Sequence, residues 1–210
     1  VIVATGSRAV RPAFLPWGSP NVWTTDEATT APDLPDSVLI MGGGVIGCEF
    51  ATIYSELGIA TMVVEMMDRL VPELDADAGR FVARSLRERG VETLAGRRIV
   101  AARDLGTGIE ADIEGGPTVR ARRLLVCVGR RPNIEDIGLD TVGARIADGV
   151  VAVDERCRTS AEGVYAIGDA AEKRQYAHLA SRMGVVAADN ATGHDAEDDR
   201  TVVPAGLYTH

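Results

Sequence analysis

Short apolar runs alternate with segments of helical periodicity along the first half of the chain. Residues 38–41 and 61–65 contain apolar runs of strand length. An amphipathic segment with helical spacing follows the second run, over residues 75–90. Between the two runs, apolar residues recur with helical spacing at Ile46, Phe50, Ile53 and Leu57. A third apolar run begins at Val91. The order strand, helix, strand, helix, strand predicts a Rossmann-like, doubly wound parallel α/β sheet.

The periodicity changes after this segment. From residue 98 to residue 120, apolar and polar residues alternate, with turn residues at 106–108 and 115–117. This pattern predicts a three-stranded antiparallel meander inserted into the α/β unit. Further strands are expected over 1–4, 124–128, 150–153 and 164–167, a helix over about 178–190, and a short helical turn capped at 25–27. Residues 194–200 are expected to form an acidic surface loop.

The strand over residues 38–41 runs directly into Gly-x-Gly-x-x-Gly, formed by Gly42, Gly44 and Gly47. In a dinucleotide-binding fingerprint the first glycine allows the tight turn, the second lets the backbone approach the pyrophosphate, and the third lets the helix pack closely on the sheet. A purely structural glycine turn is the alternative. Strand, helix, second strand and a terminal acid at Glu65 all fall in register, so the sequence predicts a dinucleotide site.

The acid at the end of the second strand predicts which dinucleotide binds. Glu65 follows Gly47 by 18 residues, close to the expected ~20. Its carboxylate can accept hydrogen bonds from the adenosine ribose hydroxyls and would repel a 2′-phosphate. Residues 66–68 are Met, Met and Asp, so no Arg follows directly. We therefore expect NAD(H) to be preferred over NADP(H).

Composition limits the class of protein further. The 210 residues are 46% hydrophobic and 25% charged, typical of a globular protein, and the net charge of −9 argues against a nucleic-acid partner. No apolar run approaches the ~18 residues of a membrane span, and no signal peptide is visible, so a cytoplasmic protein is expected.

The three cysteines, Cys48, Cys127 and Cys157, lie far apart in the sequence, so neither a metal site nor a vicinal redox disulfide is expected. Cys48 lies in the first turn of the helix after the fingerprint. A helix N-terminus can lower a thiol pKa, but packing of a small buried residue is the favoured interpretation.

Four segments together resemble a known family. They are Ala-Thr-Gly-Ser at 4–7, the fingerprint with Glu49 and Glu65, Val-Gly-Arg-Arg-Pro-Asn at 128–133, and Tyr-Ala-Ile-Gly-Asp at 165–169. In this order and spacing they resemble the FAD- and NAD-dependent pyridine nucleotide–disulfide oxidoreductases, over essentially the whole chain. Within the family the motifs are most similar to those of dihydrolipoamide dehydrogenases.

The resemblance implies a domain organisation. Residues 1–32 would end a first FAD-domain portion, 33–154 would form the NAD-binding domain, 155–203 the returning FAD-domain segment, and 204–210 the start of a dimerisation domain. It also implies a homodimer acting on a small dithiol or disulfide.

The family's redox cysteine pair and catalytic His would lie outside the chain, so no catalytic residue is assigned and the isolated chain is expected to be inactive. Alternatives are an NAD-binding module without activity, or part of a mercuric reductase, a soluble transhydrogenase or an NADH:quinone reductase.

The resemblance also implies individual roles. Glu49 would lie beside the nicotinamide and flavin, although a favourable charge at a helix N-terminus is the alternative. Asp169 would bind the flavin ribityl chain, or else cap a helix. In an unrelated protein Arg130 and Arg131 would be surface cations.

The NAD-side candidates are Gly42, Gly43, Gly44, Val45, Ile46, Gly47, Glu49, Glu65, Ile99 beside the adenine, and Gly129 near the nicotinamide. The FAD-side candidates are Thr5, Gly6, Ser7, Asp169, Gln175, Tyr176, Ala177 and His178, the last with a role at the helix start as its alternative.

Overall fold

The computed structural model describes residues 1–209, so the last residue of the expected 204–210 segment lies outside the described residues. The chain divides into two compact units. The glycine-rich unit comprises residues 9–129 and the segment beginning at Gly206, and the terminal unit comprises residues 1–8 and 130–205. These units are defined by packing, whereas the domains expected from the sequence were defined by cofactor. The domain boundaries therefore stay a prediction.

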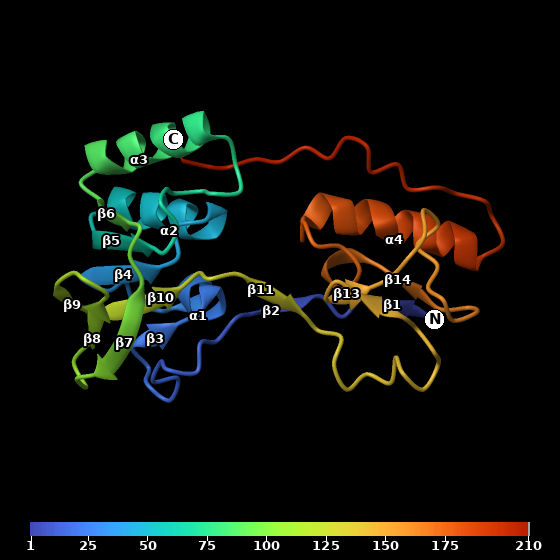
Figure 1. Cartoon of the computed structure of the whole chain (residues 1–210), viewed down its shortest axis with the longest axis horizontal. Helices are drawn as coiled ribbons and strands as arrows, with labels where there is room; N and C mark the ends of the chain where they lie inside the picture. Colours follow the sequence, from blue (N-terminus) through green and yellow to red (C-terminus); the bar gives the residue numbers. More distant parts are fainter. Residues whose placement is uncertain (210) are drawn as a thin grey trace. The chain divides into compact units, whose positions relative to one another are not determined.

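The glycine-rich unit is built on a five-stranded parallel sheet (Figure 1). Its order is β3 (Val22–Trp23), β10 (Arg123–Val126), β4 (Ser37–Met41), β5 (Ala60–Glu65) and β6 (Glu92–Ala95). The chain proceeds outward from β4 through β5 to β6, and then returns to place β10 on the other side of β4. The order therefore reverses between β4 and β10, and such a switch point is where open parallel sheets bind ligands.

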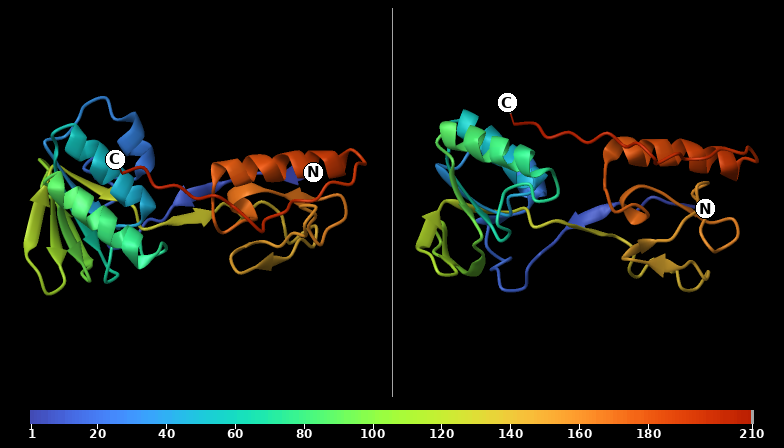
Figure 2. Two further views of the ribbon diagram at one scale, coloured as in Figure 1. Left: turned by 90° about the horizontal axis from the view of Figure 1, so that it is seen from above. Right: turned by 45° about the horizontal axis from the view of Figure 1, so that its top comes forward.

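The two faces of this sheet are covered differently. Helices α2 (Val45–Glu56) and α3 (Ala76–Glu88) lie side by side over one face (Figures 1 and 2). Val38 and Ile40 of β4 pack on the helical side, whereas Leu39 packs with the meander on the other. The meander consists of β7 (Ile99–Asp104), β8 (Ile109–Ile113) and β9 (Thr118–Ala121). The predicted α/β class and the antiparallel meander are confirmed.

The short helix α1 (Thr25–Thr30) is capped one residue before the segment 25–27, where the sequence analysis placed the cap. Its N-cap is Thr24, whose hydroxyl accepts the backbone N–H of Asp26 while the Glu27 carboxylate accepts the backbone N–H of Thr24. The spacing Thr-x-x-Glu is a capping box, and this signal was available in the sequence.

The terminal unit packs short strands against one long helix. Strand β1 (Ile2–Val3) pairs in parallel with β14 (Tyr165–Ala166), β2 (Ser7–Ala9) lies next to β11 (Arg130–Pro132), and β12 (Ile146–Ala147) pairs with β13 (Val150–Val151). The 3-10 turn η1 (Gly168–Ala170) precedes α4 (Ala177–Ala191). Strands β2, β3, β11 and β12 were not predicted, because two or three residues are too few to show a period.

The segment 194–200 differs from the expected solvated loop. Asp198 is only 3% exposed, and its carboxylate accepts a hydrogen bond of 2.5 Å from the guanidinium of Arg200. None of the helices within residues 1–209 is long and apolar enough to cross a lipid bilayer.

The packing of α2 on the sheet generates a stability prediction. A Cβ at Gly47 would lie 1.9 Å from the carbonyl oxygen of Gly42, whereas a Cβ at Gly18 would meet nothing within 4 Å. Replacing a helical Gly by Ala ordinarily stabilises by about 0.5–1 kcal/mol. The backbone clash outweighs that gain, so Gly47→Ala should lower the free energy of unfolding by about 2 kcal/mol or more. Urea unfolding measures this, with Gly18→Ala as the control. Equal stability of the two variants would contradict the contact.

Candidate functional site

The predicted NAD-side residues gather at one edge of the parallel sheet. Strand β4 ends at Met41 and runs into the fingerprint, β5 ends at Glu65, and β10 leads to Gly129. Because these strands are parallel neighbours, their carboxyl ends meet at the same edge. The structure therefore brings the glycines, the acid and Gly129 to the switch point, where a ligand of this fold class is expected.

The three fingerprint glycines have different surroundings. Gly42 has φ +105°, and a Cβ there would lie 2.3 Å from the Cys127 carbonyl oxygen on the neighbouring strand. Gly47 packs against the Gly42 carbonyl. Gly44 is half-buried, and a Cβ there would meet only the carboxylate of Glu73, at 3.3 Å. The backbone contacts of the first and third glycines thus leave no room for a side chain. The second glycine instead leaves a surface that a phosphate group can approach.

Glu65 is fixed in place by the fingerprint turn itself. Its side chain is buried, with 6% exposed, and its Oε2 accepts the backbone N–H of Gly43 at 2.6 Å. Oε1 accepts the backbone N–H of Met67 at 2.7 Å. A carboxylate has about four lone-pair positions, so both oxygens retain capacity for further donors such as ribose hydroxyls. Arg69 donates to the Pro72 carbonyl at 2.9 Å within its own loop.

The N-terminus of α2 faces this edge of the sheet. Its N-cap is Gly44, which provides no side-chain capping bond. The first N–H groups of a helix have no partner within the helix, and together with the helix dipole they attract anions. The N–H of Val45 donates to Glu73 Oε1 at 3.0 Å. The sequence analysis missed Glu73, because it comes from the loop after β5 and no spacing rule points to it.

Three further NAD-side candidates have well-defined surroundings. Glu49 Oε1 accepts the backbone N–H of Tyr208 at 3.0 Å. Ile99 is only 2% exposed and packs in the core on the meander side, so in this structure it offers almost no surface to a ligand. Gly129 has φ +106° and accepts the N–H of Val10 at 3.0 Å.

The position of Cys48 at the helix N-terminus does not lower the pKa of its thiol. Burial, reinforced by the carboxylates of Glu73, Glu65 and Glu49, raises its pKa to about 12. Burial also raises the pKa of Cys127 to about 12. Cys48 is therefore a small residue packed in the core, the interpretation that the sequence analysis favoured. Within residues 1–209 no cluster of metal-ligating side chains occurs.

In the terminal unit, hydrogen bonds join three of the motifs that carry the family resemblance, those at 4–7, 128–133 and 165–169. Ser7 Oγ donates to Asp169 Oδ2 at 2.5 Å and accepts from Arg130 Nε at 2.7 Å. Arg130 also donates to the Ser7 carbonyl at 2.8 Å. Thr5 Oγ1 donates to the Asn133 carbonyl at 2.6 Å. Arg130 is therefore a half-buried member of this network and not the surface cation that an unrelated protein would suggest.

The remaining FAD-side candidates lie just before and at the start of α4. Gln175 has φ +53°, Tyr176 is the N-cap residue, and Ala177 begins the helix. The ring of His178 stacks on that of Tyr176, with centroids 5.4 Å apart and planes inclined by 17°. Helix α4 packs on η1, which carries Asp169, so these residues belong to one region of the terminal unit.

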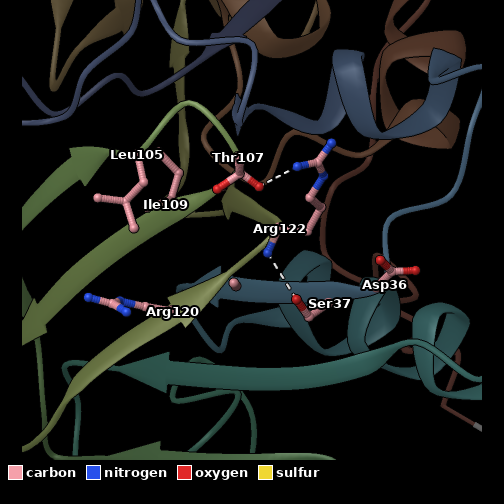
Figure 3. A pocket seen from close by; sticks show the side chains of 9 residues that line it. Asp36, Ser37, Leu105, Thr107, Ile109, Arg120 and Arg122 are labelled. Atoms are coloured by element: carbon pink, nitrogen blue, oxygen red, sulfur yellow. Dashed lines mark hydrogen bonds between the residues drawn. The ribbon is translucent and has the colours of Figure 1, made fainter.

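A separate groove of about 350 Å³ lies at the amino end of β4 (Figure 3). It is lined by Asp36, Ser37 and the meander, including Thr107 and Arg122. Arg122 spans it, since its backbone N–H donates to Ser37 Oγ at 2.9 Å and its guanidinium donates to the Thr107 carbonyl. The groove contains none of the predicted site residues and lies at the end of the strands opposite the fingerprint.

The site at the switch point defines a class of protein, and comparison with known proteins agrees with it. The model of the pyridine nucleotide-disulphide oxidoreductase family matches residues 1–184. The chain therefore belongs to this family, as the sequence motifs indicated.

Individual relatives are dihydrolipoyl dehydrogenases. The chain is 34% identical to one from Bacillus subtilis over 215 residues, covering 100% of this chain and 45% of that protein. It is 35% identical to one from Haloferax volcanii over 214 residues, covering 99% and 45%. The crystal structure of LpdA from Mycobacterium tuberculosis is 32% identical, with a TM-score of 0.89 over 99% of this chain and 46% of that one. The chain thus spans a little under half the length of these relatives.

The buried thiols generate a prediction about reactivity. Only the thiolate attacks an alkylating agent, and burial raises the pKa of the Cys48 and Cys127 thiols to about 12. Both should remain unmodified by iodoacetamide at pH 8 in the folded chain and should react fully in denaturant, as intact-mass spectrometry measures. Cys157, whose pKa burial raises to about 11, should behave in the same way. Rapid labelling of Cys48 in the folded chain would contradict its burial.

Proposed function

We propose that this chain is the NAD(H)-binding portion, with part of the FAD-binding portion, of a flavin-dependent oxidoreductase. Such an enzyme passes electrons between a dithiol or disulfide, FAD and NAD, in the manner of a dihydrolipoyl dehydrogenase. The observation that carries the proposal is the geometry at the switch point. A buried carboxylate, Glu65, is held against the fingerprint turn at Gly43, beside the half-buried Gly44, whose lack of a side chain leaves the helix N-terminus without a cap from its N-cap residue.

The residues present fit a dinucleotide. The open surface at Gly44 and the N–H groups of residues 45–47 suit a pyrophosphate, and the fixed carboxylate of Glu65 suits the adenosine ribose hydroxyls. In this proposal residues 33–154 form the NAD-binding domain, with Gly129 and Glu49 near the nicotinamide half and Ile99 near the adenine.

The residues of the terminal unit fit a flavin chain. Ser7 fixes one oxygen of the Asp169 carboxylate and leaves the other, Oδ1, able to accept from a ribityl hydroxyl. In this proposal residues 1–32 and 155–203 belong to the FAD domain, with residues 5–7 and 175–178 on the flavin side, and residues 204–210 begin a dimerisation domain. When bound, the flavin and nicotinamide supply the electron transfer. A dithiol substrate, a homodimer and a cytoplasmic location belong to the same proposal.

The NAD part is tested by calorimetric titration of the purified chain with NADH and with NADPH. NADH should bind at least about tenfold more tightly, because the Glu65 carboxylate repels a 2′-phosphate. Glu65→Gln should remove most of that preference, and Gly44→Val should abolish binding by filling the open surface.

The matched control is Glu92→Gln, an exposed acid at the start of β6 that should leave both affinities unchanged. Thermal unfolding of each variant separates lost binding from lost structure. Equal affinity of the wild-type chain for NADH and NADPH would refute the role of Glu65.

The FAD part is tested by fluorescence titration of the chain with FAD. Asp169→Asn should weaken binding by about tenfold, the loss expected for one charge-assisted hydrogen bond. Asp148→Asn, an exposed acid in the same unit, should not change it. If the wild-type chain binds NADH but no FAD, the chain by itself is a nucleotide-binding module without a flavin site.

A further inference from the structure

The carboxylate of Glu73 lies where a pyrophosphate would bind. Its Oε1 accepts the backbone N–H of Val45, the first residue of α2, at 3.0 Å. A Cβ built on Gly44 would lie 3.3 Å from Oε1 and 3.9 Å from Oε2, so both oxygens lie beside the face that the second fingerprint glycine leaves open. A side-chain carboxylate thus takes the place that the helix N-terminus offers to an anion.

The loop that carries Glu73 is anchored to the fingerprint turn. The N–H of Val71 donates to the Gly43 carbonyl at 2.7 Å, and the Leu70 side chain packs against Gly43. Val71 is fully buried and has φ +41°, a strained conformation for a β-branched residue, which only surrounding contacts can maintain. Glu73 follows two residues later, so its position is set by the fold. Its side chain is nevertheless exposed, and nothing prevents it from rotating into solvent.

This edge of the sheet carries several carboxylates, although the proposed function places a pyrophosphate there. Glu49, Glu65 and Glu73 all act on the thiol of Cys48, and Glu73 has the largest electrostatic effect of the three. In the proposed function Glu65 accepts from the adenosine ribose hydroxyls, and Glu49 lies near the nicotinamide. Glu73 has no such assignment, and it is the acid that directly contacts the helix N-terminus.

We propose that Glu73 is a built-in competitor for the pyrophosphate of NAD(H): its carboxylate holds the N-terminus of α2 in the free protein and must rotate away when the dinucleotide binds. This inference rests on the proposed NAD(H) site. It makes Glu73 a residue that sets affinity, so the native chain binds the dinucleotide more weakly than its fingerprint alone would allow.

The experiment compares NADH and ADP-ribose binding to the wild-type chain, Glu73→Gln and Glu73→Ala by calorimetry. Glu73→Gln keeps the shape and removes the charge, and Glu73→Ala also removes the hydrogen bond. Both variants should bind both ligands about two- to fivefold more tightly, the size of effect a carboxylate has at an exposed helix N-terminus. The gain from Glu73→Gln should shrink in 1 M salt, because salt screens the charge.

The matched control is Asp75→Asn, which removes one exposed charge from the same loop at a residue that makes no side-chain capping bond. It should change affinity less than either Glu73 variant. Equal or weaker binding by both Glu73 variants, while the wild-type chain still binds NADH, overturns the competitor role and leaves the proposed function intact. If neither the wild-type chain nor any variant binds NADH or ADP-ribose, both proposals fail together.

Discussion

A single close contact between backbones organises the glycine-rich unit. The N-terminal turn of α2 approaches the end of β4 so closely that a Cβ on Gly47 would lie 1.9 Å from the Gly42 carbonyl oxygen. Gly42 in turn leaves no room for a side chain beside the Cys127 carbonyl on β10. Because both approaches require glycine, the start of the helix is held directly at the switch point of the sheet. The open surface at Gly44 and the buried Glu65 owe their positions to this contact.

The same contact concentrates opposite charges at one edge of the sheet. The helix dipole and the unpartnered N–H groups favour an anion there, while Glu65 and Glu73 already supply carboxylates that accept from the turn and the helix. A bound dinucleotide would have to match both, with hydroxyls toward Glu65 and phosphates toward the helix. In the proposed function the two acids would have opposite consequences for affinity, since Glu65 would accept from the ligand and Glu73 would compete with it.

Much of the architecture follows from local pattern. Strands β4, β5 and β10, helices α2 to α4 and the meander carry enough residues for a period of 2 or 3.6 to be visible, and all were predicted. Strands β2, β3, β11 and β12 were not predicted, because each has only two or three residues. Of these, β2, β3 and β11 pair with segments more than a hundred residues away, whereas β12 pairs with the nearby β13. The burial of Asp198 and the role of Arg130 also escaped prediction, because an acidic run and a pair of arginines look solvated until the packing around them is known.

The sequence by itself determined the family and the α/β class, because the fingerprint is a local motif whose glycines and acid have fixed spacing. The assignment of the NAD-side residues stays a prediction from the same motif. Only the tertiary structure decided that backbone excludes a side chain at Gly42 and Gly47 but not at Gly44, and that Ile99 is buried in the core. It also decided that Cys48 is buried and that Glu73 reaches the N-terminus of α2. These properties depend on what lies across space from a residue, and contacts between distant segments leave no periodic signal in the chain.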